Sequence, residues 1–482
     1  MASEFPTRPA IAAQQLAQLR RLLAAILPAN RFYQRKLSGL DTGLSSLDDF
    51  RRFPFTAKAE LSADQRAFPP YGSNLTYPAA SCTRFHQTSG ITSAPLRWLD
   101  TPESWQSMVE SWKKIFRLAG VRSGDRVYFA FSFGPFIGFW LAFDAARQLG
   151  CLCLPGGGLS SHGRLKAIID NSAGVLCCTP SYAIRLAEVA AAANLDLRSS
   201  PVRTIIVAGE PGGSIPATRR RLEHLWPGAR VFDHHGMTET GPISHQCPAQ
   251  AGVLHVIESA YLPEVIDPRG NPVPAGEMGE LVVTTLDRLA SPLLRYRTGD
   301  LVRAAAPSCS GGLRPSQTTP APPCACGCHD LALAGGILGR ADDMLIVRGV
   351  NIYPSAVEDL LRGFAEIVEY QVKVDQSPSL PELSLRLELS AGCLDAEAVV
   401  RRVQAGLHAA FNLRVPIVLA PAGTLPRFEM KASRWLVVNR PQPGVGLIQK
   451  RASSGSGPHP ANSRNSRSPR TDFSTRPAAL VK

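Results

Sequence analysis

The sequence is poor in long hydrophobic runs. No apolar stretch in its 482 residues approaches the roughly 20 residues that a transmembrane helix needs, so we expect no membrane association. The N-terminus lacks a basic segment followed by an apolar one and a cleavage site, so we expect a cytoplasmic protein rather than a secreted one. Eleven cysteines in so long a chain do not make a disulfide scaffold. We expect reduced thiols or metal ligands instead.

Acidic residues are scarce relative to basic ones, and the net charge is +13. Residues 441–482 contain seven lysines and arginines against Asp472, which places +6 in this segment and +7 in the rest of the chain. The segment is rich in Ser, Pro, Gly and Asn, so we expect a disordered basic tail. Outside the tail no basic motif is interleaved with aromatic residues, which argues against a nucleic-acid partner.

The hydrophobic pattern predicts an α/β fold. From about residue 120 onward, short apolar runs typical of strands alternate with stretches that have helical spacing. A Gly- and Pro-punctuated strand pattern then predicts a small β subdomain. We expect strands at 126–133, 174–179 and 203–210, helices at 9–26, 137–150 and 182–193, and no internal repeat.

The pattern of hydrophobic residues changes after residue 341. Helical patterns at 355–364 and 395–411 flank alternating patterns at 369–375 and 383–390, which together predict a small α+β domain. Residues 304–323 are a low-complexity insertion. We therefore expect three parts: a large multilayer body at 1–341 that contains the insertion, a small mobile domain at 342–440, and the tail at 441–482.

Two motifs have the residue types that bind phosphates and bases. The Thr/Ser/Gly-rich segment HQTSGITSAP (86–95) offers hydroxyls and backbone N–H groups that can hold phosphate oxygens. Alone it is a weak signal, because such loops are mostly turns. The segment VAGEPGG (207–213) follows a buried-type strand, where ligands commonly bind in open α/β sheets.

Two further motifs add carboxylates. In FDHHGMTETG (232–241) a glycine permits close approach of a flat base, while Glu239 and the hydroxyl of Thr238 suit Mg²⁺ and phosphate. In RYRTGD (295–300) Asp300 can accept hydrogen bonds from both hydroxyls of a ribose.

These motifs occur in the same chain order as in a known family. Together with GRADDMLIVRGVNIYPSAVE (339–358) and LPRFEMKASR (425–434), they resemble the adenylate-forming superfamily of acyl- and aryl-CoA synthetases. Within it the chain is most similar to the phenylacetate–CoA ligase branch, whose N-terminal sequence pattern also appears in NRFYQRKL (30–37) and FPFTAKAEL (53–61). The resemblance covers about residues 15–440 and implies an adenylate-forming body with a small mobile C-terminal domain.

The resemblance implies nucleotide-binding roles at the matching positions. The phosphate loop would contain Thr88, Ser89, Gly90 and Thr92. The adenine base would contact Gly209, Glu210, Pro211, His235 and Gly236. Thr238 and Glu239 correspond to the α-phosphate and Mg²⁺ positions, Asp300 to the ribose-binding carboxylate, and Arg340 to a second ribose or phosphate contact.

Three positions in the small domain match the parts that move. Asp342 corresponds to the hinge, and Gly349 lies in the loop that such enzymes bring to the pantetheine channel. Lys431 corresponds to the lysine that approaches the carboxylate and α-phosphate during adenylation. Thiol attack on the acyl-adenylate needs that lysine removed, which explains why a hinged domain suits this chemistry.

The implied function is an AMP-forming acid–thiol ligase that uses ATP, Mg²⁺, coenzyme A and an aryl or related carboxylic acid. A carrier-protein pantetheine is an alternative acceptor, because both thiols end in the same arm. A catalytically impaired nucleotide-binding homologue is a second alternative. The family's loop usually reads T-T-G-K-P, whereas this chain has Ile91-Thr92-Ser93-Ala94-Pro95, and His235 replaces the usual Tyr or Phe. The oligomeric state stays open, with a homodimer as one option.

Two further clusters have competing interpretations. The resemblance implies a structural zinc site, because several phenylacetate–CoA ligase-like proteins carry a similar Cys…His pair followed by C-x-C-G. Its ligands would be Cys247, His255, Cys324 and Cys326, with Cys328, His329 and His245 as spare ligands. The alternative is a set of reduced surface thiols. For the acyl pocket, the aromatic residues Phe133, Phe136 and Tyr182 offer an apolar slot for a flat acid, or they are ordinary core.

Overall fold

The structure is a computed structural model that describes residues 5–88, 95–305, 323–348, 350–375, 381–428 and 434–438. Residues 1–439 form one compact unit, and the second unit, residues 440–482, lies outside the described residues together with the predicted tail. Most of the 304–323 insertion lies outside them as well. No helix among the described residues is both long and apolar enough to cross a membrane.

The N-terminal helices pack on a core of their own. Helix α1 places Leu19, Leu22, Leu23 and Ile26 on one buried face, as the 3.6-residue period requires. This face contacts Leu286, Leu293 and Tyr296 from much later in the chain, so the N-terminus is tied to the body. The elements of this part are α1 (Arg8–Ile26), α2 (Arg31–Lys36), η1 (Asp48–Arg52), α3 (Lys58–Ala67), η2 (Ala79–Ser81) and the antiparallel pair β1 (Arg84–Gln87) and β2 (Arg97–Asp100).

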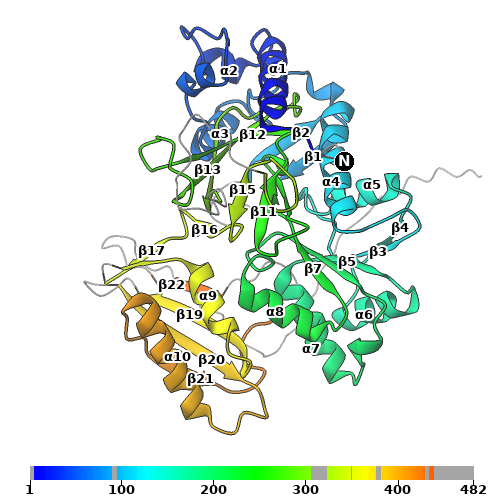
Figure 1. Ribbon diagram of the computed structural model, residues 1–482, viewed down its shortest axis with the longest axis vertical. Coiled ribbons are helices and arrows are strands. Elements are labelled where there is room, and N and C mark those ends of the chain that lie inside the picture. The colour runs from blue at the N-terminus through cyan, green and yellow to red at the C-terminus, as the bar shows by residue number, and fades with distance from the viewer. Residues whose placement is uncertain are drawn as a thin grey trace, which may run out of the picture. The chain divides into compact units, whose positions relative to one another are not determined.

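A five-stranded parallel sheet forms the centre of the body (Figure 1). Its spatial order is β4 (Leu152–Pro155), β3 (Arg126–Phe129), β5 (Val175–Cys178), β6 (Thr204–Val207) and β7 (Arg230–Asp233). Because successive side chains point to opposite faces, Val127 and Phe129 pack against one layer of helices and Tyr128 and Ala130 against the other. The first layer is α4 (Pro102–Leu118) and α5 (Trp140–Gln148); the second is α6 (Ser161–Asp170), α7 (Pro180–Ala192) and α8 (Pro216–Leu225), with η3 (Leu197–Ser199) nearby in sequence.

Antiparallel strands follow the parallel sheet. A four-stranded sheet has the order β12 (Tyr261–Ile266), β13 (Met278–Thr285), β14 (Tyr296–Arg303) and β16 (Gly339–Arg340). A three-stranded sheet has the order β10 (Ser244–Gln246), β11 (Val253–Val256) and β15 (Ala332–Ala334). The short pair β8 (Gly236–Met237) and β9 (Gly241–Pro242) lies within the predicted FDHHGMTETG motif.

The last part is an α+β unit with its own core. Its sheet has the order β21 (Ile417–Ala420), β20 (Glu382–Leu389), β19 (Ile367–Asp375) and β22 (Trp435–Val438), preceded by the hairpin β17 (Leu345–Val347) and β18 (Val350–Ile352). Residues of α9 (Pro354–Arg362) and α10 (Ala396–Phe411) pack with β19 and β20, as Figure 1 shows in yellow and orange.

The predicted fold class, a parallel α/β body followed by a smaller α+β unit, is confirmed. The expected boundary at residue 341/342 stays a prediction. One predicted strand is too long: the run 126–133 forms a strand only to Phe129. The chain turns there, because the N–H of Phe131 donates to the carbonyl of Phe129 at 2.8 Å, and Pro135 has no N–H for a ladder.

Candidate functional site

Two predicted motifs lie at one edge of the parallel sheet. Strands β6 and β7 are neighbours, and the segments 207–213 and 232–241 follow their carboxyl ends, which is where ligands bind in open α/β sheets. Gly209 has φ +93°, a conformation that favours glycine. Glu210 Oε1 accepts a 2.7 Å hydrogen bond from the N–H of Ser181 at the start of α7, which fixes the loop to that helix.

The two adjacent histidines of the second motif have different surroundings. His234 is buried, its ring lies 4.4 Å from that of Trp112, and its Nδ1 is 2.8 Å from the carbonyl oxygen of Ser244. Burial lowers the pKa of His234 to about 4, so this imidazole is neutral and structural. His235 instead points to Asp300, with its Nε2 2.9 Å from Oδ2.

Asp300 is the centre of a charged cluster formed by two paired strands. Strand β14 presents it opposite Arg340 of β16, and Arg340 Nη1 donates to Oδ1 at 3.1 Å. Arg340 also makes a bidentate pair with Asp342, at 2.8 and 3.1 Å. Both oxygens of Asp300 therefore have protein partners. The structure brings His235, Asp300, Arg340 and Asp342 together.

The Thr238–Glu239 turn is held by a pair that the sequence pattern did not reveal. Arg288 Nη1 donates to the carbonyls of Thr238 and Glu239 at 3.0 and 2.7 Å. Its Nε and Nη2 bind the two carboxylate oxygens of Asp100, both at 2.7 Å, and both side chains are fully buried. No local signal marks this pair, because its members are separated by 188 residues.

The turn itself is tight, and its carboxylate has a cation beside it. A Cβ at Gly236 would lie 2.7 Å from the carbonyl oxygen of Gly241, so only glycine fits between β8 and β9. Glu239 is buried, and its Oε1 lies 3.2 Å from Nζ of Lys58, the first residue of α3. Lys58 lies in the FPFTAKAEL segment (53–61), which resembles the N-terminal part of the family but was given no role in the site.

Several predicted residues lie outside the described residues. These are Ser89, Gly90 and Thr92 of the phosphate loop, Gly349 and Lys431. The first residue of that loop, Thr88, is buried, and its N–H and Oγ1 bond the carbonyl and N–H of Leu96 at 2.9 and 3.0 Å. Pro211 follows Glu210 in the loop after β6.

The three aromatic residues predicted for the acyl pocket do not form one group. Phe133 packs among aromatic rings on one face of the parallel sheet, with Trp140 at 4.8 Å and Phe131 at 5.6 Å between centroids. Tyr182 belongs to the core on the opposite face, where its hydroxyl lies 3.0 Å from Ser161 Oγ. Phe136 is half-buried near Gly134. Tyr182 and Phe133 therefore pack on opposite faces of the sheet, and the acyl pocket stays a prediction.

The predicted metal ligands converge although they come from distant segments. The ligand atoms of Cys247, His255, Cys324 and Cys326 all lie within 4.8 Å of one another. The Sγ atoms of Cys247 and Cys324 are 3.7 Å apart, and Cys326 Sγ is 3.4 Å from His255 Nε2. In a tetrahedral zinc site with Zn–S near 2.3 Å, ligand atoms lie about 3.5–3.8 Å apart.

The remaining nitrogen of this histidine is also placed as in metal sites. His255 Nδ1 lies 3.2 Å from the carbonyl oxygen of Asp330, to which an Nδ1–H would donate, leaving the Nε2 lone pair free for a metal. Burial raises the pKa of the Cys326 thiol to about 12, so a cation is needed to make it a thiolate. The donor set therefore fits Zn²⁺.

The parallel α/β body with carboxylate-bearing loops at its sheet edge, followed by an α+β unit, is that of an AMP-binding enzyme, as two family models show. Residues 86–286 match the family model of the AMP-binding enzyme, and residues 349–438 match that of the AMP-binding enzyme C-terminal domain. A phenylacetate–coenzyme A ligase of Thermus thermophilus is 31% identical over 446 residues, which are 88% of this chain and 95% of the relative. One of Pseudomonas putida is 30% identical over 402 residues, covering 81% and 84%.

Solved structures of a CoA ligase are also similar to this chain. A 2-hydroxyisobutyryl-CoA ligase in the postadenylation state matches with a TM-score of 0.82 and 28% identity, covering 91% of both chains. The same ligase in the thioesterification state matches with a TM-score of 0.65 over the same coverage. The chain belongs to the AMP-binding enzyme family, in the branch of the phenylacetate–CoA ligases, and the resemblance seen in the sequence is confirmed.

Proposed function

We propose that the protein is an AMP-forming acid–CoA ligase, which joins an aryl or related carboxylic acid to coenzyme A by way of an acyl-adenylate. The observation that carries this proposal is the cluster around Asp300. This buried carboxylate is flanked by His235 and Arg340, in a chain that is similar to a phenylacetate–CoA ligase over 95% of that relative's length. The names of those relatives, phenylacetate–CoA ligases, support the acid and the acceptor.

The residues of the site suit the first half-reaction, in which a carboxylate attacks the α-phosphate of ATP. Asp300 would accept hydrogen bonds from the ribose hydroxyls, and Arg340 would hold that carboxylate in place. Gly209, Glu210, Pro211 and Gly236 would border the adenine. Thr88 and Thr238 would contact phosphate oxygens. Glu239 would hold Mg²⁺, which, when bound, reduces the repulsion between two anionic reactants; Lys431 would add one positive charge on the acid side.

The arrangement of the α+β unit supports a two-state cycle. Sequence identity and coverage are equal for the two states of the 2-hydroxyisobutyryl-CoA ligase, so the TM-scores of 0.82 and 0.65 differ through the arrangement of the parts. In such a cycle Asp342 would be the hinge, and Gly349 would be brought to the thiol channel after rotation. A carrier-protein pantetheine stays the alternative acceptor.

Acid-dependent ATP–pyrophosphate exchange tests the proposal. We expect exchange with at least one acid from a panel that includes phenylacetate and 2-hydroxyisobutyrate, and release of the acyl-CoA when coenzyme A is added. Lys431→Ala should abolish exchange and spare thioester formation from supplied acyl-adenylate. Absence of exchange with every acid would favour the impaired homologue that the altered 91–95 loop suggests. Equal loss of both half-reactions in the variant would contradict the rotation.

We also propose a structural zinc ion held by Cys247, His255, Cys324 and Cys326. The spacing of the ligand atoms and the carbonyl partner of His255 support it. The ion would join β11 and the residue that follows β10 to the segment after the insertion.

Metal analysis of the purified protein tests this second proposal. We expect about one zinc per chain, lost in Cys324→Ser and Cys326→Ser and retained in the control Cys82→Ser, whose thiol lies outside the cluster. A folded wild-type protein without zinc would refute it.

A further inference from the structure

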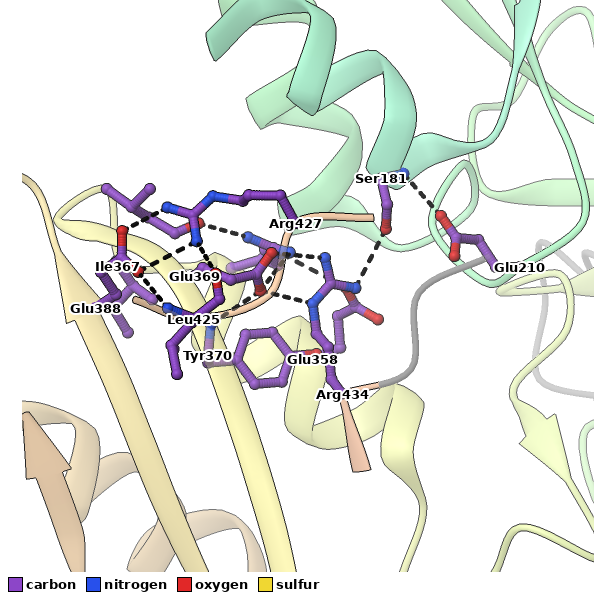
Figure 2. A network of polar contacts seen from close by, with 12 residues as sticks. Ser181, Glu210, Glu358, Ile367, Glu369, Tyr370, Glu388, Leu425, Arg427 and Arg434 are labelled. Carbon is purple, nitrogen blue, oxygen red and sulfur yellow. Dashed lines mark hydrogen bonds and ion pairs between the residues drawn. The ribbon is translucent and has the colours of Figure 1, made fainter. Parts of the chain in front are cut away.

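Arginine–carboxylate pairs gather where the α+β unit meets helix α7 (Figure 2). Arg434 lies in a buried bidentate pair with Glu369 of β19, with Nε–Oε1 at 2.7 Å and Nη2–Oε2 at 3.1 Å. Its Nη1 is also 3.5 Å from Glu358 of α9. Arg434 directly precedes β22, and its carbonyl accepts the N–H of Val372 at 2.8 Å, so the whole residue is fixed to β19.

A second pair repeats this arrangement seven positions earlier in the chain. Nη1 and Nη2 of Arg427 both donate to the carboxylate of Glu388 on β20. The same carboxylate accepts the N–H groups of Gly423 and Leu425 at 2.9 and 3.2 Å. The chain before residue 428 is therefore fixed by Glu388 and the chain after residue 433 by Glu369. Lys431, which the proposed function assigns to adenylation, stands between them in the sequence.

Both arginines also reach the body, and they reach the same helix. Arg434 Nη1 donates to Ser181 Oγ of α7 at 3.2 Å, and Arg427 Nε lies 3.6 Å from Glu188 Oε2, two turns further along. Ser181 in turn gives its N–H to Glu210, the residue expected beside adenine. A chain of contacts thus runs from the adenine loop through Ser181 to the flank of Lys431.

We propose that Arg427 and Arg434 are positioning residues for the adenylation half-reaction: by binding Glu188 and Ser181 of α7, they hold the residues on both sides of the segment that contains Lys431 against the body. This inference rests on the proposed function. The contacts to α7 exist only while the α+β unit is docked as described, so they act in one half-reaction and not in the other.

The relative strengths of the contacts suit a unit that has to leave. Inside the α+β unit each arginine makes a bidentate, charge-assisted pair, which is among the stronger side-chain interactions. Toward α7 each makes one single contact, at 3.2 or 3.6 Å. Detachment would therefore break these single contacts, together with the 2.7 Å bond from Arg221 of α8 to the carbonyl of Ile367, and keep Arg427 and Arg434 neutralised by their own carboxylates.

Variants on the body side test this without removing an arginine, whose loss would leave Glu369 or Glu388 unpaired and could unfold the unit. Ser181→Ala removes the Oγ acceptor but keeps the N–H that Glu210 binds, and Glu188→Gln removes the charge. We expect the double variant S181A/E188Q to lower ATP–pyrophosphate exchange about tenfold, as a kcat effect, since one or two hydrogen bonds to a charged donor are lost. Thioester formation from supplied phenylacetyl-adenylate and coenzyme A should stay within about twofold of wild type.

Arg402→Gln is the matched control, because Arg402 pairs with Glu366 inside the α+β unit and is half-exposed. It should leave both half-reactions unchanged. Equal rates of exchange in S181A/E188Q and wild type, or equal loss of both half-reactions, would overturn the inference while the proposed function stands.

Hydrogen exchange gives a readout that needs no turnover. In S181A/E188Q the peptide covering residues 180–188 should exchange faster, while peptides of α10 stay as in wild type. If the wild type activates no acid, the proposed function fails. Hydrogen exchange at residues 180–188 then still tests whether Arg427 and Arg434 bind α7. Unchanged protection at 180–188 would refute it.

Discussion

The buried pair of Arg288 and Asp100 offers a way to separate the stability of the body from the geometry of its site. Arg288 binds both oxygens of Asp100 and also donates to the carbonyls of Thr238 and Glu239. Replacing it with methionine keeps an unbranched, flexible side chain and removes the guanidinium group with its charge. Asp100 is then a carboxylate without a partner and with no access to solvent.

The expected magnitude follows from that burial. Breaking a buried ion pair from one side costs about 3–5 kcal/mol, because the remaining charge is uncompensated. Replacing both partners with apolar residues is nearly neutral by comparison. We therefore expect Arg288→Met to lower the free energy of unfolding by about 4 kcal/mol and the double variant R288M/D100L to recover most of it.

The site should not recover with the fold. The carbonyls of Thr238 and Glu239 lack their donor in both variants, so the turn that carries the Glu239 carboxylate loses its support. Urea unfolding and ATP–pyrophosphate exchange, measured on the wild type and both variants, separate the two effects. Stability should return in R288M/D100L while exchange stays at least about tenfold low. If exchange returns with stability, Arg288 does not position the turn.

Three other predictions concern neighbouring residues. Lys58→Gln removes the cation that competes for Glu239, so the Mg²⁺ concentration for half-maximal exchange should fall up to about fivefold; an increase would show that Lys58 acts on phosphate instead. Gly236→Ala sets a Cβ against the carbonyl oxygen of Gly241 and should lower the free energy of unfolding by about 1–3 kcal/mol, seen in urea titrations. The buried His234 has its pKa lowered from 6.5 to about 4, so the unfolded chain alone binds a proton between these values. Stability should therefore be complete above pH 6.5 and fall by about 3 kcal/mol toward pH 4, and His234→Gln should flatten this part of the profile.

Much of the fold could be predicted because its signals are local. The helix expected at 9–26 is observed at Arg8–Ile26, and the strand expected at 369–375 is observed at Ile367–Asp375. Both depend on hydrophobic periodicity within one segment. The strand at 126–133 was overextended, since periodicity does not show where the chain leaves a ladder. For Tyr182, composition suggested a pocket, whereas the structure packs it in the core between α7, the helix that carries it, and the parallel sheet.

The contacts that hold the site could not be predicted, because they join residues far apart in sequence. Arg288 and Asp100 are separated by 188 positions, and Arg434 and Ser181 by 253. An isolated arginine in a sequence carries no sign of its partner, whereas a motif such as RYRTGD can be recognised from neighbours alone. The convergence of Cys247, His255, Cys324 and Cys326 could be expected despite their separation, because the family resemblance pointed to these four residues, and the zinc ion itself stays a proposal.

Arginine–carboxylate pairs have two different roles in this molecule, and the burial of each pair determines its role. The Arg288–Asp100 pair has no access to solvent, so separating it would leave charges that water cannot reach, and the turn it holds stays fixed throughout the cycle. Arg427 and Arg434 pair with Glu388 and Glu369 inside the α+β unit and make only single contacts to α7. Separating the unit from α7 therefore leaves both arginines paired. An enzyme that needs a rigid nucleotide site and a detachable lysine can therefore use arginine–carboxylate pairs for both, provided that the permanent pair spans the parts to be fixed and the detachable pairs lie within the part that moves.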